Sequence, residues 1–398
     1  MRIVFLNPSG ELGGAETALL DLLAALREAR PAWALSLVAS APGPLIDHTS
    51  RLGIHSVALP FPSSLARLGE WGRRGSVLAR VQLALAATGA ALPVLSYASA
   101  LRRHLAAIDP DIVHTNGLKM HLLGARCRPT RTKVLWHLHD YPDARPLTAA
   151  LLRASAGRCA GVIANSASVA EQTRRLLGSN VTVRTVHNAV DLERFNPHGP
   201  RLDLDALSRL PALAPGGLRI GLVGTFARGK GHDVFLRALS RVRSDVPIRA
   251  YVIGGPIYET HGSQFSEAEL RGLAASAGVG DTVGFTGRVE DVPAALRALD
   301  IVVHASVEPE PFGLVIAEAM ACGRPLVVSR AGGAAEIAQA GALFHDPGDA
   351  DGLADRLSQL AVDAPLRAEL GVAGREAATR LFARSHLASA LIPVYESL

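Results

Sequence analysis

The sequence predicts an α/β protein built from two doubly wound, Rossmann-like domains. The chain has 398 residues, which exceeds the usual size of one hydrophobic core and fits two domains of roughly 200 residues each. Short apolar runs alternate with helical patterns, as they do in parallel sheets whose strands are joined by helices. The turn-rich segment VDLERFNPHGP at 190–200 interrupts this alternation, which then restarts.

The strand-like runs define the expected order of elements. In the first half they lie at residues 2–7, 35–40, 112–115, 133–139, 161–166 and 181–188, and in the second half at 218–224, 249–255, 282–287, 300–306 and 325–329. We therefore expect an N-terminal domain over 1–195 and a second domain over 196–380. The remaining segment, 381–398, has a helical pattern.

Composition excludes several classes of protein. No apolar run reaches the ~18 residues that a membrane span needs, and the N-terminus reads as a strand rather than a signal peptide. The three cysteines have no C-x-x-C spacing, so neither a disulfide framework nor a zinc site is indicated. We expect a cytoplasmic protein without a bound metal ion or cofactor.

Charge is divided unevenly along the chain. Residues 1–198 hold 22 Lys+Arg and 13 Asp+Glu, net +9, whereas the remainder is net −4. Residues 51–103 contain seven arginines but only one acid, Glu70. The arginines alternate with apolar residues such as Trp71, a pattern typical of an interfacial helix. The alternative is an ordinary surface helix with its apolar stripe in the core. Aromatics make up only 5% of the chain and do not alternate with arginines, which argues against nucleic acid as a partner.

Two carboxylates eight residues apart are the strongest functional signal. Glu310 stands between two prolines, and Glu318 lies in the apolar run LVIAEAMA, where an unpaired charge is costly. Between them, Gly313 opens a predicted helix whose N-terminus favours a phosphate. A ligand with hydroxyls at both ends and a diphosphate between them satisfies all three features. Nucleotide sugars have that shape.

A lysine in a glycine loop indicates the same ligand. Lys119, Lys133 and Lys230 are the only lysines among 41 basic residues, so a functional role is expected for one placed between two glycines before a helix. The compact ammonium of Lys230 suits a diphosphate, and Arg228 in the same loop offers bidentate contacts.

Two further motifs lie at predicted strand ends. The loop SGELGGAET at 9–17 places Gly13 and Gly14 where the backbone can approach a ligand, but it lacks the G-x-G-x-x-G pattern of dinucleotide-binding oxidoreductases. The sequence WHLHD at 136–140 ends with His137 and His139 on one strand face. Two histidines on one strand face followed by Asp140 also suggest a metal site, but no motif supplies a third ligand.

The order of these motifs resembles that of the retaining glycosyltransferases of family 4, the glycosyl transferases group 1, which adopt the GT-B fold. Residues 308–327 are similar to the family's Glu-x7-Glu motif, and 224–239 to its G-R-x(n)-K-G loop, with Thr225 at the usual arginine position. The resemblance covers essentially the whole chain. It implies an acceptor-binding first domain and a nucleotide-sugar-binding second domain facing a cleft, with the C-terminal helix crossing back to the first.

The resemblance also implies roles for individual residues. Glu310 would contact the donor sugar and Glu318 the ribose, and the implied catalytic set is Lys230, Arg228, Glu310 and His139. Which of His137 and His139 contacts a sugar hydroxyl stays open, with His139 favoured. The implied donor-binding residues are Gly13, Gly14, Gly254, Arg288, Val289, Phe312, Gly313, Leu314, Val315 and Glu318. The implied acceptor side holds Glu16, Asn116 and His137.

The activity implied by the resemblance is metal-independent transfer of a sugar, with retention of configuration, from a UDP- or GDP-sugar. The expected acceptor is a glycan or a lipid-linked molecule of cell-surface polysaccharide or glycolipid synthesis, reached at the inner face of the plasma membrane. Alternatives are a nucleotide-sugar epimerase of the same fold, an enzyme that glycosylates a soluble small molecule, and a two-lobed solute-binding protein. The last normally needs an export signal.

Overall fold

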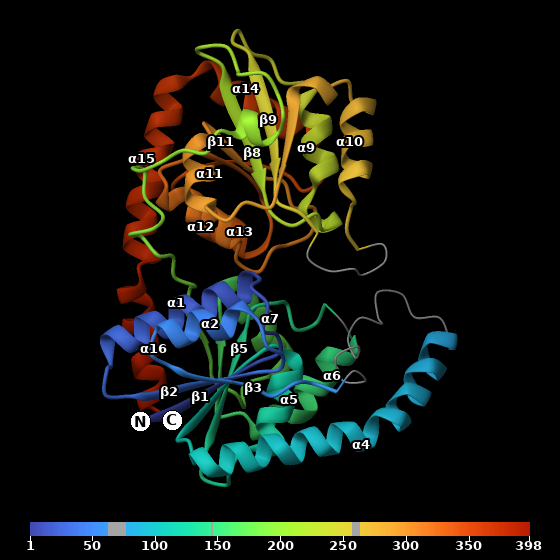
Figure 1. The fold of residues 1–398 in the computed structure, drawn as a ribbon, viewed down its shortest axis with the longest axis vertical. Helices are drawn as coiled ribbons and strands as arrows, with labels where there is room; N and C mark the ends of the chain where they lie inside the picture. Colours follow the sequence, from blue (N-terminus) through green and yellow to red (C-terminus); the bar gives the residue numbers. More distant parts are fainter. Residues whose placement is uncertain (63–76, 145, 257–262) are drawn as a thin grey trace. The chain divides into compact units, whose positions relative to one another are not determined.

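The computed structural model describes residues 1–62, 77–144, 146–256 and 263–398, and its chain divides into two compact units (Figure 1). Unit 1 comprises Met1–Ala189 together with Arg384–Leu398, and unit 2 comprises Val190–Ala383. The last helix therefore belongs to the same unit as the N-terminus, as the resemblance implied.

Unit 1 is built on a seven-stranded parallel sheet in the order β3-β2-β1-β4-β5-β6-β7. Its strands are β1 Arg2–Asn7, β2 Ala34–Ala39, β3 His55–Ala58, β4 Ile112–Asn116, β5 Lys133–Leu138, β6 Gly161–Ala164 and β7 Val183–Thr185. The strand order reverses between β1 and β4. In open α/β sheets, ligands bind at the carboxyl ends of the strands beside such a reversal.

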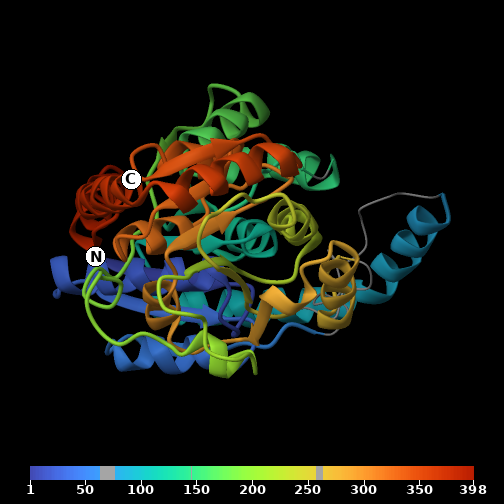
Figure 2. The ribbon, with the colours of Figure 1, turned by 90° about the horizontal axis from the view of Figure 1, so that it is seen from above.

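Two helical layers cover this sheet because successive side chains along each strand point to opposite faces. On β1, Phe5 packs in a cluster with α1 (Gly14–Ala29), α2 (Pro44–Arg51) and α16 (Arg384–Glu396). Its neighbour Val4 packs in a cluster with α4 (Val77–Ile108), α5 (Leu118–Cys127), α6 (Pro146–Ser155) and α7 (Ala167–Leu177). The N-terminal part of α4 extends beyond the rest of unit 1 in both ribbon views (Figures 1 and 2).

Unit 2 repeats the design with a six-stranded parallel sheet in the order β10-β9-β8-β11-β12-β13. Its strands are β8 Leu218–Val223, β9 Ile248–Ile253, β10 Val283–Gly287, β11 Ile301–His304, β12 Leu326–Ser329 and β13 Ala342–His345. One face packs against α11 (Val292–Ala298), α12 (Leu314–Ala321), α13 (Gly332–Ile337) and α15 (Ala364–Leu381). The other packs against α9 (His232–Leu239), α10 (Glu267–Ser276) and α14 (Ala350–Val362). The order reverses between β8 and β11.

The prediction of two doubly wound parallel sheets is confirmed, with two strands added. The additional strands, β3 and β13, each form one edge of a sheet and are partly exposed. A half-exposed edge strand lacks the continuous apolar run by which the central strands were predicted.

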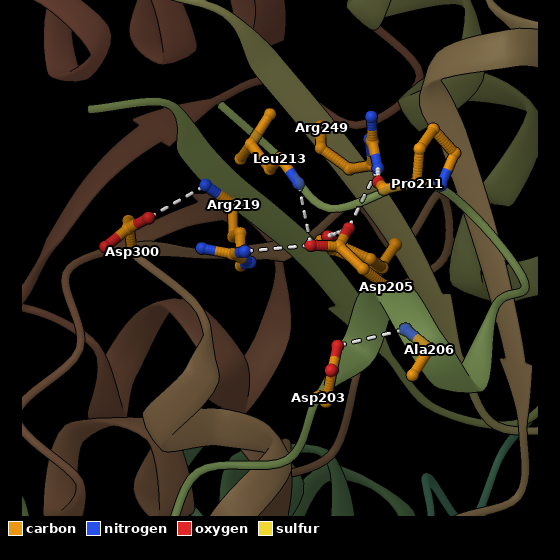
Figure 3. A network of polar contacts seen from close by, with 9 residues as sticks. Asp203, Asp205, Ala206, Pro211, Leu213, Arg219, Arg249 and Asp300 are labelled. Carbon is orange, nitrogen blue, oxygen red and sulfur yellow. Dashed lines mark hydrogen bonds and ion pairs between the residues drawn. The ribbon is translucent and has the colours of Figure 1, made fainter. Parts of the chain in front are cut away.

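An ion network around one buried carboxylate joins the start of unit 2 to its sheet (Figure 3). Asp205, on the short helix α8 (Leu204–Leu207), accepts hydrogen bonds from Tyr251 Oη at 2.5 Å and Leu213 N at 3.1 Å. Arg219 and Arg249 each lie 2.9 Å from the same carboxylate. Burial alone would raise the pKa of Asp205, but these donors outweigh it and lower the pKa to about 2. The network fixes the segment that follows Val190 against β8 and β9.

Candidate active site

The two strongest sequence signals come together at the reversal of strand order in unit 2. Lys230 follows β8, Glu310 follows β11, and these two strands are neighbours in the sheet. Lys230 Nζ lies 2.5 Å from Glu310 Oε1. The sheet therefore pairs a cation and a carboxylate at the edge where ligands of such folds bind.

Glu310 is held by a second pair of side chains that the sequence did not reveal. Its Oε2 lies 2.7 Å from His304 Nε2 and accepts a hydrogen bond from Ser306 Oγ at 2.9 Å. Burial alone would raise the pKa of the Glu310 carboxyl, but Lys230 and then His304 hold that pKa well below its usual value. The available signal was the sequence His304-Ala305-Ser306 at the end of a predicted strand.

Glycines allow the loops of this site to approach one another closely. Gly231 has φ +69°, and a Cβ placed there would lie 1.9 Å from the Ala305 carbonyl oxygen. Gly254, with φ +137°, is equally close to the Gly224 carbonyl oxygen. Any other residue at either position would be strained and would push the two loops apart. The two glycines therefore allow a backbone conformation and a loop contact that a side chain would prevent.

The helix that carries Glu318 begins as predicted. Gly313 is the N-cap of α12 with φ +84°, and Glu318 is half-buried one turn before the helix ends. Phe312 is only 3% exposed and packs edge-to-face on Phe382, so it anchors the loop in the core. Leu314, Val315 and Val289 also pack against this core, whereas Arg288 is exposed after β10.

Arg228, in the same loop as Lys230, contacts α10 and a neighbouring aromatic ring. Its guanidinium is 2.9 Å from Glu269 Oε1 on α10 and stacks over the Phe265 ring at 4.2 Å. The side chain is 44% exposed. Arg228 thus forms an ion pair on the surface of unit 2, and an exposed pair of this kind contributes little to stability.

In unit 1, the glycine loop after β1 is organised by Glu16. Its Oε1 accepts a hydrogen bond from Asn7 Nδ2 at 3.1 Å, and its Oε2 accepts one from Gly13 N at 3.2 Å. Glu16 therefore caps its own helix. A Cβ at Gly14 would meet nothing within 4 Å, whereas at Gly10 it would lie 2.3 Å from the Ala41 carbonyl oxygen. Gly10 therefore lets the loop after β1 pack closely against the loop after β2.

The predicted histidines gather with Asn116 at the carboxyl ends of β4 and β5. The His137 and His139 rings lie 4.1 Å apart, and His139 Nε2 is 3.2 Å from Asn116 Oδ1. Burial lowers the pKa of His139 to about 4, and burial followed by the neighbouring imidazoles holds the pKa of His137 well below its usual value. Both rings are therefore neutral at physiological pH.

Three further expectations concern the interfacial segment, membrane spans and metal sites. Arg67, Arg73, Arg74 and Trp71 of the predicted interfacial segment lie outside the described residues. No helix in the described ranges has the length and hydropathy to cross a bilayer. Among the residues placed in the structure, no cluster of three or more His, Cys, Asp or Glu has the arrangement of a metal site.

Both parts of the chain match models of glycosyltransferase families. Residues 12–194 match the model of glycosyltransferase family 4, and residues 217–363 match that of glycosyl transferases group 1. D-inositol 3-phosphate glycosyltransferase 2 of Catenulispora acidiphila is 37% identical over 249 residues, which are 59% of this chain and 55% of that protein. The match thus spans about half the length of such relatives.

Solved structures share the fold over the whole chain. Anabaena HepE in complex with UDP and glucose has a TM-score of 0.80 at 23% identity, with 100% of both chains covered. Sucrose-phosphate synthase of Thermosynechococcus elongatus has a TM-score of 0.78 at 21% identity, covering 100% of this chain and 99% of that chain. The chain therefore belongs to glycosyltransferase family 4 and has the GT-B fold.

Proposed function

We propose that the protein transfers a sugar, with retention of anomeric configuration, from a nucleotide diphosphate sugar to an acceptor. The observation that carries this proposal is the Lys230–Glu310 pair at the reversal between β8 and β11, next to the glycine-capped start of α12. An ammonium suits the diphosphate, and a buried carboxylate accepts hydrogen bonds from sugar hydroxyls. In this proposal unit 2 binds the donor and unit 1 the acceptor.

The proposed mechanism stabilises the leaving group. Lys230 and the N–H groups at the start of α12, after Gly313, would take up the charge that develops on the diphosphate as the glycosidic bond breaks. Arg228 would add a second cation on exchanging its surface partner Glu269 for phosphate oxygens. A diphosphate oxygen would then take the acceptor proton on the face where the new bond forms. These steps need neither an enzyme nucleophile nor a metal ion.

Other residues would set the position of the donor. Glu318 would accept hydrogen bonds from the ribose hydroxyls, and Arg288 with Val289 would lie beside the base. Gly254 would let the loop after β9 approach the nucleotide. UDP-sugars are the first donors to test, because HepE of the same fold is found with UDP and glucose; GDP-sugars come next.

Two acceptor classes are proposed for testing. The first is a glycan or lipid-linked acceptor, which the basic first half of the chain favours. The second is a small soluble polyol phosphate, which the name of the Catenulispora relative favours. Acceptor contacts would come from Glu16, Asn116 and His137, and His139 would contact a sugar hydroxyl beside them.

The test is release of nucleoside diphosphate from UDP-, GDP-, ADP- and TDP-sugars, with and without each acceptor. Transfer that depends on an acceptor, with the anomeric configuration kept in the NMR spectrum of the product, is the expected result. Inversion would refute the retaining mechanism. Conversion of a donor without any acceptor would identify an epimerase, and inertness toward every donor would reject the proposal.

Membrane attachment is tested separately by liposome flotation. We expect binding to vesicles that contain anionic lipid at low salt, and release at high salt, because screening weakens contacts with exposed arginines. Absence of binding at low salt, combined with efficient use of a soluble acceptor, would favour the polyol phosphate class.

A further inference from the structure

A buried chain of hydrogen bonds connects the C-terminal helix with the predicted site histidines. Tyr395, in the last turn of α16, places its Oη 2.8 Å from His114 Nδ1 on β4. His114 Nε2 lies 3.2 Å from His137 Nδ1 on β5. The exposed fractions of the three side chains are 1%, 0% and 2%. All three belong to unit 1.

We propose that Tyr395 is a positioning residue, which acts through His114 to hold His137 in the tautomer that carries its proton on Nε2. This inference rests on the proposed function for its role in the reaction, whereas the tautomer itself is a property of the folded chain.

The number of protons in the chain limits the possible arrangements. Burial, followed by the imidazoles of His139 and His121, lowers the pKa of His114 to about 3. The pKa of His137 is also well below its usual value, and burial raises that of Tyr395 well above its own. At neutral pH the phenol keeps its proton and each imidazole carries one.

Two directions of donation remain, and the hydrogen-bond count separates them. If Tyr395 donates to His114 Nδ1, then His114 Nε2–H donates to His137 Nδ1, and only the His137 Nε2–H lacks a partner among the described residues. In the reverse direction, both the Tyr395 hydroxyl proton and the His137 Nε2 lone pair lack one. Each direction leaves one donor without a partner, but the reverse direction also leaves the His137 Nε2 lone pair without one among the described residues. One additional buried unsatisfied group costs enough to favour the first direction by about tenfold.

The resulting donor belongs to a ring whose centroid lies 4.1 Å from that of His139, beside other buried polar atoms. His139 Nε2–H donates to Asn116 Oδ1, which leaves the His139 Nδ1 lone pair without a partner in the described part of the chain. Asn116 Nδ2 is buried and also without one there. A neutral hydroxyl can accept from His137 and donate to His139, whereas a phosphate or carboxylate has no proton to offer the Nδ1 lone pair. The chemistry therefore matches a sugar or polyol hydroxyl.

The tautomer can be read directly from the full-length protein labelled with ¹⁵N-histidine. Two-bond ¹H–¹⁵N spectra distinguish the Nε2–H form from the Nδ1–H form, and a His137→Gln variant assigns the signal. We expect His137 in the Nε2–H form in the wild type and in a mixture of both forms in Tyr395→Phe. Tyr97→Phe is the matched control, because Tyr97 is also buried in unit 1 but its hydroxyl has no partner among the described residues. This control should leave the His137 signal unchanged.

Kinetics test whether the tautomer matters for transfer. Tyr395→Phe should lower kcat/KM about tenfold, as expected for one hydrogen bond, and should leave the affinity for free nucleoside diphosphate unchanged. The proposal would be overturned if His137 in the wild type carried its proton on Nδ1, or if the His137 tautomer were unchanged in Tyr395→Phe. A changed tautomer with normal kcat/KM would overturn the positioning role. A wild type that uses no donor would instead refute the proposed function, since the spectrum needs no turnover.

Discussion

Mild acid should destabilise unit 1 because it contains fully buried neutral histidines. His114 and His121 are at most 1% exposed, and His137 is 2% exposed. Burial, followed by nearby imidazoles, lowers the pKa of His114 and of His121 to about 3, and holds that of His137 well below 6.5. Between the folded and unfolded pKa values, only the unfolded chain binds these protons. The free energy of unfolding therefore falls as pH decreases below about 6.5.

The size of the effect follows from the distance between pH and the unfolded pKa. A pH of about 5 lies about 1.5 units below the unfolded pKa of a histidine, which is about 6.5. Protonation of one such histidine therefore stabilises the unfolded chain by about 2 kcal/mol. The three histidines together cost about 6 kcal/mol. Typical domains are stable by only about 5–15 kcal/mol, so unit 1 should approach unfolding near pH 5.

The assay is urea denaturation followed by tryptophan fluorescence at a series of pH values. All three tryptophans precede residue 190 in the sequence, so their fluorescence follows unit 1. We compare wild type with His121→Gln, which removes one buried histidine, and with His386→Gln, which removes an exposed one on α16. Between about pH 5 and 6, His121→Gln should reduce the slope of unfolding free energy against pH by about 1.4 kcal/mol per unit, whereas the control should not. Equal slopes in wild type and His121→Gln would refute the reasoning.

Further predictions concern unit 2. Lys230→Ala should lower transfer by about 10² or more in a folded protein, because one charge-assisted contact to the leaving group is lost, whereas exposed Lys133→Ala should retain normal rates. Glu318→Gln should weaken nucleoside diphosphate binding in calorimetry, and Glu310→Gln should reduce the transfer rate with little change in that binding; the opposite pattern would contradict the assigned roles. Asp205→Asn should lower the stability of unit 2 by about 3 kcal/mol in scanning calorimetry, since two arginines lose their shared carboxylate, and an unshifted transition would show that the network contributes little.

The central strands could be predicted because their signal is local. Each is a continuous apolar run, as expected for a strand covered on both faces, and the predicted run at 2–7 coincides with β1. The runs at 218–224 and 300–306 likewise contain β8 and β11. The glycines beside Lys230 and the spacing of Glu310 and Glu318 are local features as well. These residues could therefore be predicted as site residues without knowledge of the sheet.

Contacts between distant segments required the tertiary structure. Lys230 meets Glu310 across 80 residues because β8 and β11 are neighbours, although their order in the sequence does not make them consecutive. Arg228 pairs with Glu269 on α10, 41 residues away. Tyr395 reaches His114 across 281 residues because α16 returns to unit 1. Local periodicity carries information on which residues form a strand or helix, but strand order and the return of the last helix depend on which apolar faces bury one another.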